Sequence, residues 1–116
     1  MLEVKVDSLK NFIFIKMEGF MHDDDMKMAA EKVISEAKKL KTNYTVITDV
    51  TKFKPSSQNG AMEIQKAQKF LLDNGAAKFI RIVESVLGKM QFTKNAKEVG
   101  LQVIEVRTYE DALTHL

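Results

Sequence analysis

Apolar and polar residues alternate strictly along residues 2–7 (LEVKVD), at the start of the chain. This period of two is typical of a strand with one buried face. A short polar turn at residues 8–11 leads to a second apolar segment, residues 12–18 (FIFIKME). Adjacent strands joined by a short turn usually pair antiparallel. We therefore predict that the chain opens with a β-hairpin.

The period changes in residues 19–41, where apolar residues recur every three or four positions. That spacing predicts an amphipathic helix. Acidic residues occupy its first turn and lysines its last turn, which suits the helix dipole at both ends. The residues expected on its inward face are Met26, Ala29, Ala30, Val33, Ala37 and Leu40.

Strand and helix patterns alternate through the rest of the chain. Residues 44–50 (YTVITDV) are rich in β-branched residues and almost uninterrupted, as in a strand buried on both faces. The further elements expected are a helix at 57–74 closed by Asn74 and Gly75, a strand at 77–85, a helix at 85–100, a strand at 101–106 and a helix at 108–116. Helices between strands imply right-handed crossovers and parallel strands. We predict one α/β domain over residues 1–116, with a mixed, mostly parallel five-stranded sheet and the order β-β-α-β-α-β-α-β-α.

Composition narrows the class of protein. With 116 residues, 45% hydrophobic and 29% charged, the chain resembles one soluble globular domain. Its net charge of +2 is too small to favour nucleic acid, which generally requires a clustered basic face. The lack of cysteine excludes disulfides, thiolate nucleophiles and cysteine-based zinc sites. No apolar run approaches the roughly 20 residues that span a bilayer, and the first residues lack the order of a signal peptide. We expect a cytoplasmic protein without an integral membrane segment.

The segment TDVTKFKPSSQNG, residues 48–60, joins a predicted strand to a predicted helix. Pro55 biases Lys54 away from helical geometry, so the helix should begin after the proline, with Ser56, Ser57 or Asn59 as its N-cap. A catalytic serine would need a base and an oxyanion pocket, and the sequence offers neither a GxSxG motif nor a nearby histidine. A phosphorylation switch stays open as the alternative, because a phosphoryl group at a helix start meets the positive end of the dipole.

Three further features near this segment or its neighbouring strand invite a functional interpretation. Asp49 lies at the carboxyl end of a predicted parallel strand, where sites of α/β proteins gather. We favour the alternative that its carboxylate accepts hydrogen bonds from the loop. Arg81 lies within an apolar strand, so it must pair or extend to solvent, and Asp49 is a conceivable partner. Phe53, between Lys52 and Lys54, either is an interface aromatic or tucks beneath its loop.

Residues 22–25 (HDDD) have the chemistry of metal ligands. Successive side chains fan apart by about 100° on a helix, however, so few of them could converge on one ion. We favour a capping role at the start of the first helix. The sequence also lacks the glycine-rich motifs that cradle nucleotide phosphates and any complete catalytic set. We therefore predict a protein that needs no metal and no organic cofactor.

The hairpin, the helix, the strand ending in TDVTKF and the helix opened by serines together resemble the STAS superfamily of anti-sigma-factor antagonists. The similarity is greatest to the SpoIIAA-like branch of bacterial domains and spans nearly the whole chain. Asp49, Pro55, the segment FIRIVES with Arg81, the segment KMQFTKNAKEVG and the terminal YEDALTHL carry the resemblance.

The resemblance implies a regulatory module and not an enzyme. Such a module binds a protein, such as a regulatory kinase or an anti-sigma-like factor. Family members that act as antagonists carry a phosphorylatable serine where Ser56 and Ser57 lie, typically as Asp-Ser-Ser/Thr-Gly. In this chain Pro55 replaces the aspartate, and two residues separate the serines from Gly60. The related Sec14-type lipid-binding domains imply an alternative function, a carrier of a lipid or another small molecule. A homodimer is also left open.

Charge around the segment suits a protein partner. Four lysines between residues 52 and 72 oppose only Glu63, which gives a local net charge of +3. An acidic surface or a phosphate group would be attracted there, over a range of about 10 Å at moderate salt. We expect residues 54–60 (KPSSQNG) to be a surface recognition loop, with Asp49, Lys52 and Phe53 as candidate residues beside it.

Overall fold

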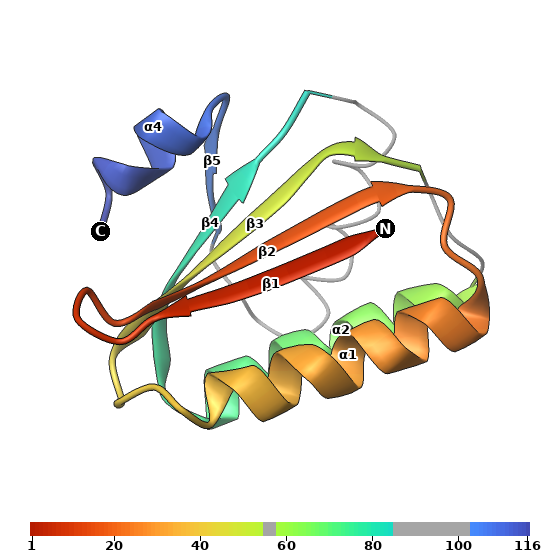
Figure 1. Ribbon diagram of the computed structural model, residues 1–116, viewed down its shortest axis with the longest axis horizontal. Helices are drawn as coiled ribbons and strands as arrows, with labels where there is room; N and C mark the ends of the chain where they lie inside the picture. Colours follow the sequence, from red (N-terminus) through yellow and green to blue (C-terminus); the bar gives the residue numbers. More distant parts are fainter. Residues whose placement is uncertain (55–57, 85–102) are drawn as a thin grey trace.

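The computed structural model describes residues 1–54, 58–84 and 103–116. Five strands form one sheet in the order β1-β2-β3-β4-β5 (Figure 1). The strands are β1 (Leu2–Asp7), β2 (Phe12–Gly19), β3 (Tyr44–Phe53), β4 (Ala76–Ile82) and β5 (Val103–Val106). The first pair is antiparallel and the other three pairs are parallel. The predicted hairpin and the mixed, mostly parallel five-stranded sheet are confirmed.

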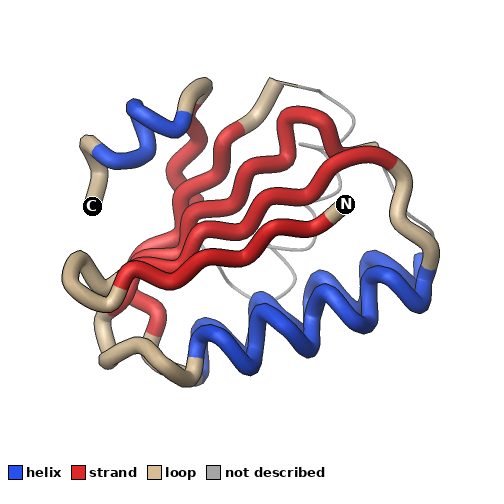
Figure 2. Tube along the Cα trace, in the orientation of Figure 1, coloured by secondary structure: helices blue, strands red, loops and turns tan. Residues whose placement is uncertain are grey.

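Helices cover both faces of this sheet. The described helices are α1 (Asp23–Ala37), α2 (Gln58–Asp73) and α4 (Tyr109–Leu113). Helices α1 and α2 run together beneath one face, and α4 lies on the other face (Figure 2). The helix predicted at residues 85–100 lies outside the described residues. The chain therefore forms a helix–sheet–helix arrangement in which the sheet is the middle layer.

The alternation of strand side chains divides the core in two. Ile13, Ile15 and Met17 point toward α1 and α2, whereas Phe12 points toward α4 and joins the second cluster. The helical residues predicted to be buried, Ala30, Val33 and Ala37, are 5%, 4% and 0% exposed. Their burial confirms the inward face that the three- and four-residue spacing of α1 indicated.

The ends of two elements differ from the prediction. Helix α1 ends at Ala37, so the lysines expected in its last turn lie beyond it. The amides of Lys39 and Leu40 bond to carbonyls three residues back, which tightens the chain out of α-helical geometry. Strand β3 continues to Phe53 because, beyond a bulge, the end of β2 goes on pairing with it. As predicted, α2 closes just before Asn74 and Gly75, and Gly75 adopts φ +108°.

A buried hydroxyl joins the start of β3 to the end of α2. The Tyr44 side chain is 0% exposed, and its hydroxyl donates to the Leu71 carbonyl at 3.1 Å. The side-chain amide of Asn74 donates to the same hydroxyl at 3.3 Å. Burial raises the pKa of Tyr44 above its ordinary value of 10.0, and the Asn74 hydrogen bond opposes this shift.

Replacing Tyr44 with phenylalanine is expected to lower the free energy of unfolding by about 1–2 kcal/mol, because the Leu71 carbonyl and the Asn74 amide lose their buried partner. Since the folded-state pKa is raised, the contribution of the phenol is fully present below about pH 10 and is lost as the pH rises through the folded value. Urea titrations at about pH 8 and about pH 11 should show a smaller alkaline loss of stability in the variant than in the parent. An equal alkaline loss of stability in both proteins would contradict the raised pKa of Tyr44.

Candidate functional site

The parallel strands β2 and β3 finish at the end of the molecule where α1 and α2 begin (Figure 1). Gly19 pairs with Phe53, and the Lys54 amide donates to the Gly19 carbonyl at 3.1 Å. The side-chain amide of Asn59 donates to the Asp23 carboxylate at 3.4 Å, which ties the start of α2 to the start of α1. We call this region the helix-start end of the domain.

Part of the predicted recognition loop lies at this end. Lys52 and Lys54 are exposed, as a recognition role requires. Phe53 between them is only 2% exposed and belongs to the core, so of the two alternatives it tucks beneath its loop. Pro55, Ser56 and Ser57 lie outside the described residues.

Asp49 forms local hydrogen bonds, as we favoured, but within its strand and not with the loop. Its carboxylate accepts from the backbone amide of Thr51 at 3.0 Å and from the Thr51 hydroxyl at 2.8 Å. Because β3 runs on to Phe53, Asp49 lies within the strand and not at its end. Its side chain lines an open groove with Phe14 and Lys16, on the face of the sheet opposite α1 and α2.

Arg81 is buried at 4% exposure and lines the space beneath α1 and α2. It pairs in register with Thr48, so Asp49 points to the other face of the sheet and the suggested Asp49–Arg81 ion pair is wrong. The charge beside Arg81 is that of Glu105, its register partner on β5. Burial lowers the pKa of Arg81 to about 10, and the Glu105 carboxylate opposes this shift.

The acidic segment at residues 22–25 caps α1. The backbone amide of His22 donates to the Asp25 carboxylate at 3.1 Å, and the first turn holds three aspartates. Within residues 1–54, 58–84 and 103–116, no group of three potential metal ligands comes together. Over the same residues, no helix is long and apolar enough to cross a membrane.

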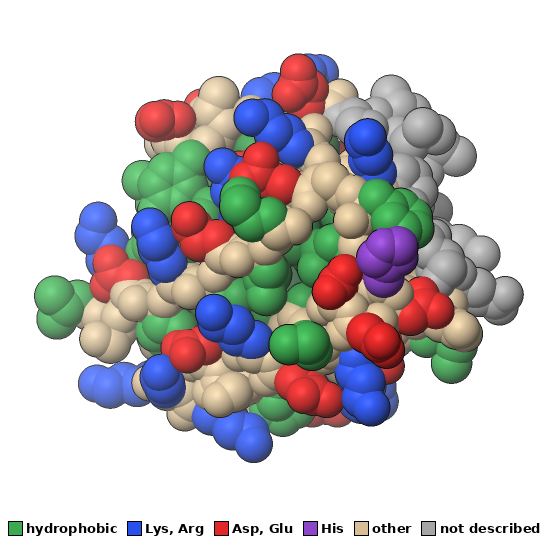
Figure 3. Space-filling view, turned by 45° about the vertical axis from the view of Figure 1, so that its right-hand side comes forward, with side chains coloured by type: hydrophobic (Ala, Val, Ile, Leu, Met, Phe, Trp, Pro, Cys, Tyr) green, Lys and Arg blue, Asp and Glu red, His purple; other side chains and the backbone are tan. Residues whose placement is uncertain are grey.

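An exposed apolar groove lies between β1 and α1 at the helix-start end. Phe20 is 55% exposed and Met28 is 68% exposed. Figure 3, which brings the right-hand end of Figure 1 forward, shows hydrophobic side chains exposed among acidic and basic ones. In the sequence, the one sign of this groove is that Met28 falls outside the apolar face predicted for the first helix. The groove, of about 390 Å³, is lined by Met1, Leu2, Phe20, Met21, Asp25, Met28, Ala29 and Lys32.

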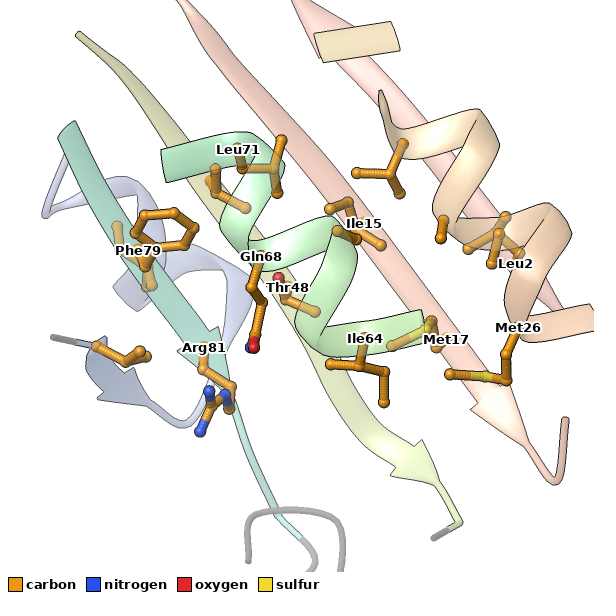
Figure 4. Close-up of a pocket in the computed structure, with 17 residues that line it drawn as sticks. Leu2, Ile15, Met17, Met26, Thr48, Ile64, Gln68, Leu71, Phe79 and Arg81 are labelled. Carbon is orange, nitrogen blue, oxygen red and sulfur yellow. The ribbon is translucent and has the colours of Figure 1, made fainter. Parts of the chain in front are cut away.

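A second cavity lies between the sheet and α1 and α2 (Figure 4). Its volume is about 70 Å³, and most of its lining is aliphatic or aromatic. Thr48, Gln68 and Arg81 contribute its polar groups, from β3, α2 and β4. Sequence periodicity gave no signal for this cavity, because its volume depends on how two helices sit on the sheet.

The chain matches no protein-family model and no curated protein. Solved structures nevertheless share its fold over nearly its whole length. An uncharacterised protein with a SpoIIAA-like fold from Shewanella loihica is 14% identical, with a TM-score of 0.73 over 100% of this chain and 92% of its own. The anti-sigma factor antagonist SpoIIAA in its unphosphorylated form is 12% identical, with a TM-score of 0.74 over 99% and 95%. The Bacillus cell fate determinant SpoIIAA in its phosphorylated form is 16% identical, with a TM-score of 0.68 over 99% and 98%. The chain has the SpoIIAA-like fold that its sequence resembled.

Proposed function

We propose that this domain is a non-enzymatic regulatory module that binds another protein through its helix-start end. The observation that carries the proposal is the full-length likeness to anti-sigma factor antagonists, at a TM-score of 0.74 for SpoIIAA. The partner would be an anti-sigma-like factor or a regulatory kinase. A cytoplasmic location is part of the same proposal.

The chemistry of the helix-start end supports a protein partner. Lys52 and Lys54 are exposed beside the end of β2, and Phe20 and Met28 expose apolar surface in the groove nearby. Apolar anchors surrounded by charge are typical of protein interfaces, where the charges steer the encounter and the apolar groups hold the complex. Pro55 restricts its own backbone, which lowers the entropy lost when the segment docks.

The two serines have a capping role in this proposal. Ser56 and Ser57 directly precede α2, where a hydroxyl can accept a hydrogen bond from a free backbone amide. The phosphorylated form of the Bacillus neighbour supports the alternative that one of them is a switch. Pro55 and the two residues before Gly60 depart from the pattern of the phosphorylated family members, so we favour the cap.

Reversing the charge of both lysines, Lys52→Glu with Lys54→Glu, is expected to reduce capture of the partner from a lysate of the source cells by at least about tenfold. The matched control is Lys10→Glu with Lys41→Glu, because both of these lysines are exposed at the opposite end of the sheet. Captured proteins are identified and quantified by mass spectrometry. Equal capture by the two double variants would remove Lys52 and Lys54 from the recognition surface.

The same capture separates the two roles of the serines. Ser56→Asp with Ser57→Asp should retain the partner if the serines cap, because aspartate caps a helix as well as serine does. Loss of the partner, together with an unchanged melting temperature, would instead favour a phosphorylation switch.

A further inference from the structure

Among the strands that the structure describes, β1 pairs only with β2 and forms one edge of the sheet (Figure 1). The Glu18 amide donates to the Met1 carbonyl at 2.9 Å, and the Met1 nitrogen donates to the Glu18 carbonyl at 2.9 Å. In an antiparallel pair, residues that exchange two hydrogen bonds alternate with residues that exchange none. The residues of β1 whose amides and carbonyls face away from β2 are therefore Leu2, Val4 and Val6.

The side chains of β1 divide between the two faces of the sheet. Leu2, Val4 and Val6 are half-buried and pack against the core between the sheet and the helices α1 and α2. Glu3 and Lys5 lie on the opposite face, where they line an open groove. The Lys5 ammonium is 3.6 Å from the Glu3 carboxylate, and the two side chains are 72% and 43% exposed. The edge is therefore apolar toward the helices and carries alternating charges on its other face.

The order of these charges favours pairing with a second copy of the chain. Charges on an edge strand often prevent such pairing. In an antiparallel pair with Val4 opposite Val4, however, Glu3 of each copy lies opposite Lys5 of the other. Opposite charges at facing positions stabilise a pair of strands, and like charges destabilise it. Moving one strand by two residues would place Glu3 opposite Glu3, or Lys5 opposite Lys5. The charges therefore select one register.

The same register uses the outward backbone groups of β1. With Val4 on the two-fold axis, Leu2 of each copy lies opposite Val6 of the other. Because all of these residues direct their amides and carbonyls away from β2, each facing pair can exchange two hydrogen bonds. Their side chains meet on the helix-covered face of the sheet and extend its apolar layer. The hydrogen bonds and apolar contacts hold the copies together, whereas exposed ion pairs add little affinity and mainly fix the register.

We propose that β1 is a self-association edge, at which two copies of this domain pair antiparallel through residues 2–6 with a two-fold axis at Val4. A second copy suits this edge because the charge pattern is complementary to itself under that symmetry. The helix-start ends of the two copies then point in opposite directions. Lys52 and Lys54 lie on or just after β3, two strands away from β1, and stay exposed in the dimer. The dimer forms from the purified chain alone, so it does not depend on the proposed regulatory function.

Sedimentation velocity of the purified chain over a dilution series tests the dimer. We expect a dimer fraction that rises with concentration. Glu3→Lys or Lys5→Glu places like charges opposite each other twice in the dimer, so each variant should raise the dissociation constant by at least about tenfold. An equimolar mixture of the two variants restores both opposite pairs and should form a heterodimer about as tightly as the parent. A parent that stays monomeric, single variants that dimerise like the parent, or a mixture no tighter than either variant would overturn the proposal.

Amide hydrogen exchange followed by NMR tests the same edge without a charge variant. The amides of Glu3 and Lys5 bond to β2 within one copy and should be protected at every concentration. The amides of Leu2, Val4 and Val6 should exchange quickly in dilute solution and become protected as the dimer forms. Val4→Pro removes an outward donor and spares the bonds to β2, so it should weaken the dimer by at least about tenfold. Unchanged exchange at Val4 in samples that contain dimer would show that the copies meet at another surface.

Discussion

Replacing Val33 with aspartate is expected to remove most or all of the stability of the domain. Val33 is 4% exposed on the inward face of α1 and packs in the core between the helices and the sheet. Aspartate there would bury a charge without a partner and remove an apolar side chain, a combination that costs about 4 kcal/mol or more. Typical domains have only about 5–15 kcal/mol of stability in total. Urea denaturation followed by circular dichroism measures the loss.

Met28→Asp is the matched control for this substitution. Met28 lies on the same helix, but its side chain is 68% exposed. The same charge at this position should change the free energy of unfolding by no more than about 0.5 kcal/mol. Similar losses for the two variants would mean that α1 does not pack on the sheet through Val33.

Replacing Phe53 with alanine is expected to lower the free energy of unfolding by about 3–5 kcal/mol. The ring is 2% exposed and lies in the core at the end of β3, where its strand pairs with Gly19 of β2. Truncation would leave a cavity that the two paired strands cannot close by moving independently. Thermal and urea denaturation both measure the effect.

The neighbouring variant Lys54→Ala is the control, because Lys54 is exposed and its backbone bond to Gly19 survives the change. It should be nearly neutral for stability. If Phe53→Ala instead kept full stability and lost only the captured partner, Phe53 would be an interface aromatic and its assignment to the core would be wrong.

Periodicity predicted most of the fold, because burial on a sheet or beneath a helix imposes a fixed spacing on apolar residues. The hairpin of β1 and β2 and the inward face of α1 at Val33 and Ala37 follow directly from it. The end of β3 could not be predicted in this way. The polar residues after Val50 give no strand pattern of their own, and pairing with the end of β2 holds them in the sheet.

The candidate site was predictable only where its interactions are local. Asp49 bonds to Thr51, two residues away, and a short carboxylate near a loop already favours that arrangement. The suggested Asp49–Arg81 pair failed because the face that each residue occupies depends on strand register. Arg81 is level with Thr48, a one-residue difference that places Asp49 on the other side of the sheet. The cavity around Arg81 was unpredictable for a further reason, since it arises from the packing of helices on strands.

The most direct test of the proposed function is to map where the captured and purified partner contacts this domain, by following backbone amide shifts in the full chain. We predict that the changes concentrate at residues 20–28, 52–54 and 58–62, which form the helix-start end. Changes concentrated at residues 8–11 and 40–43, which Asn11 joins at the opposite end of the sheet, would contradict the proposal.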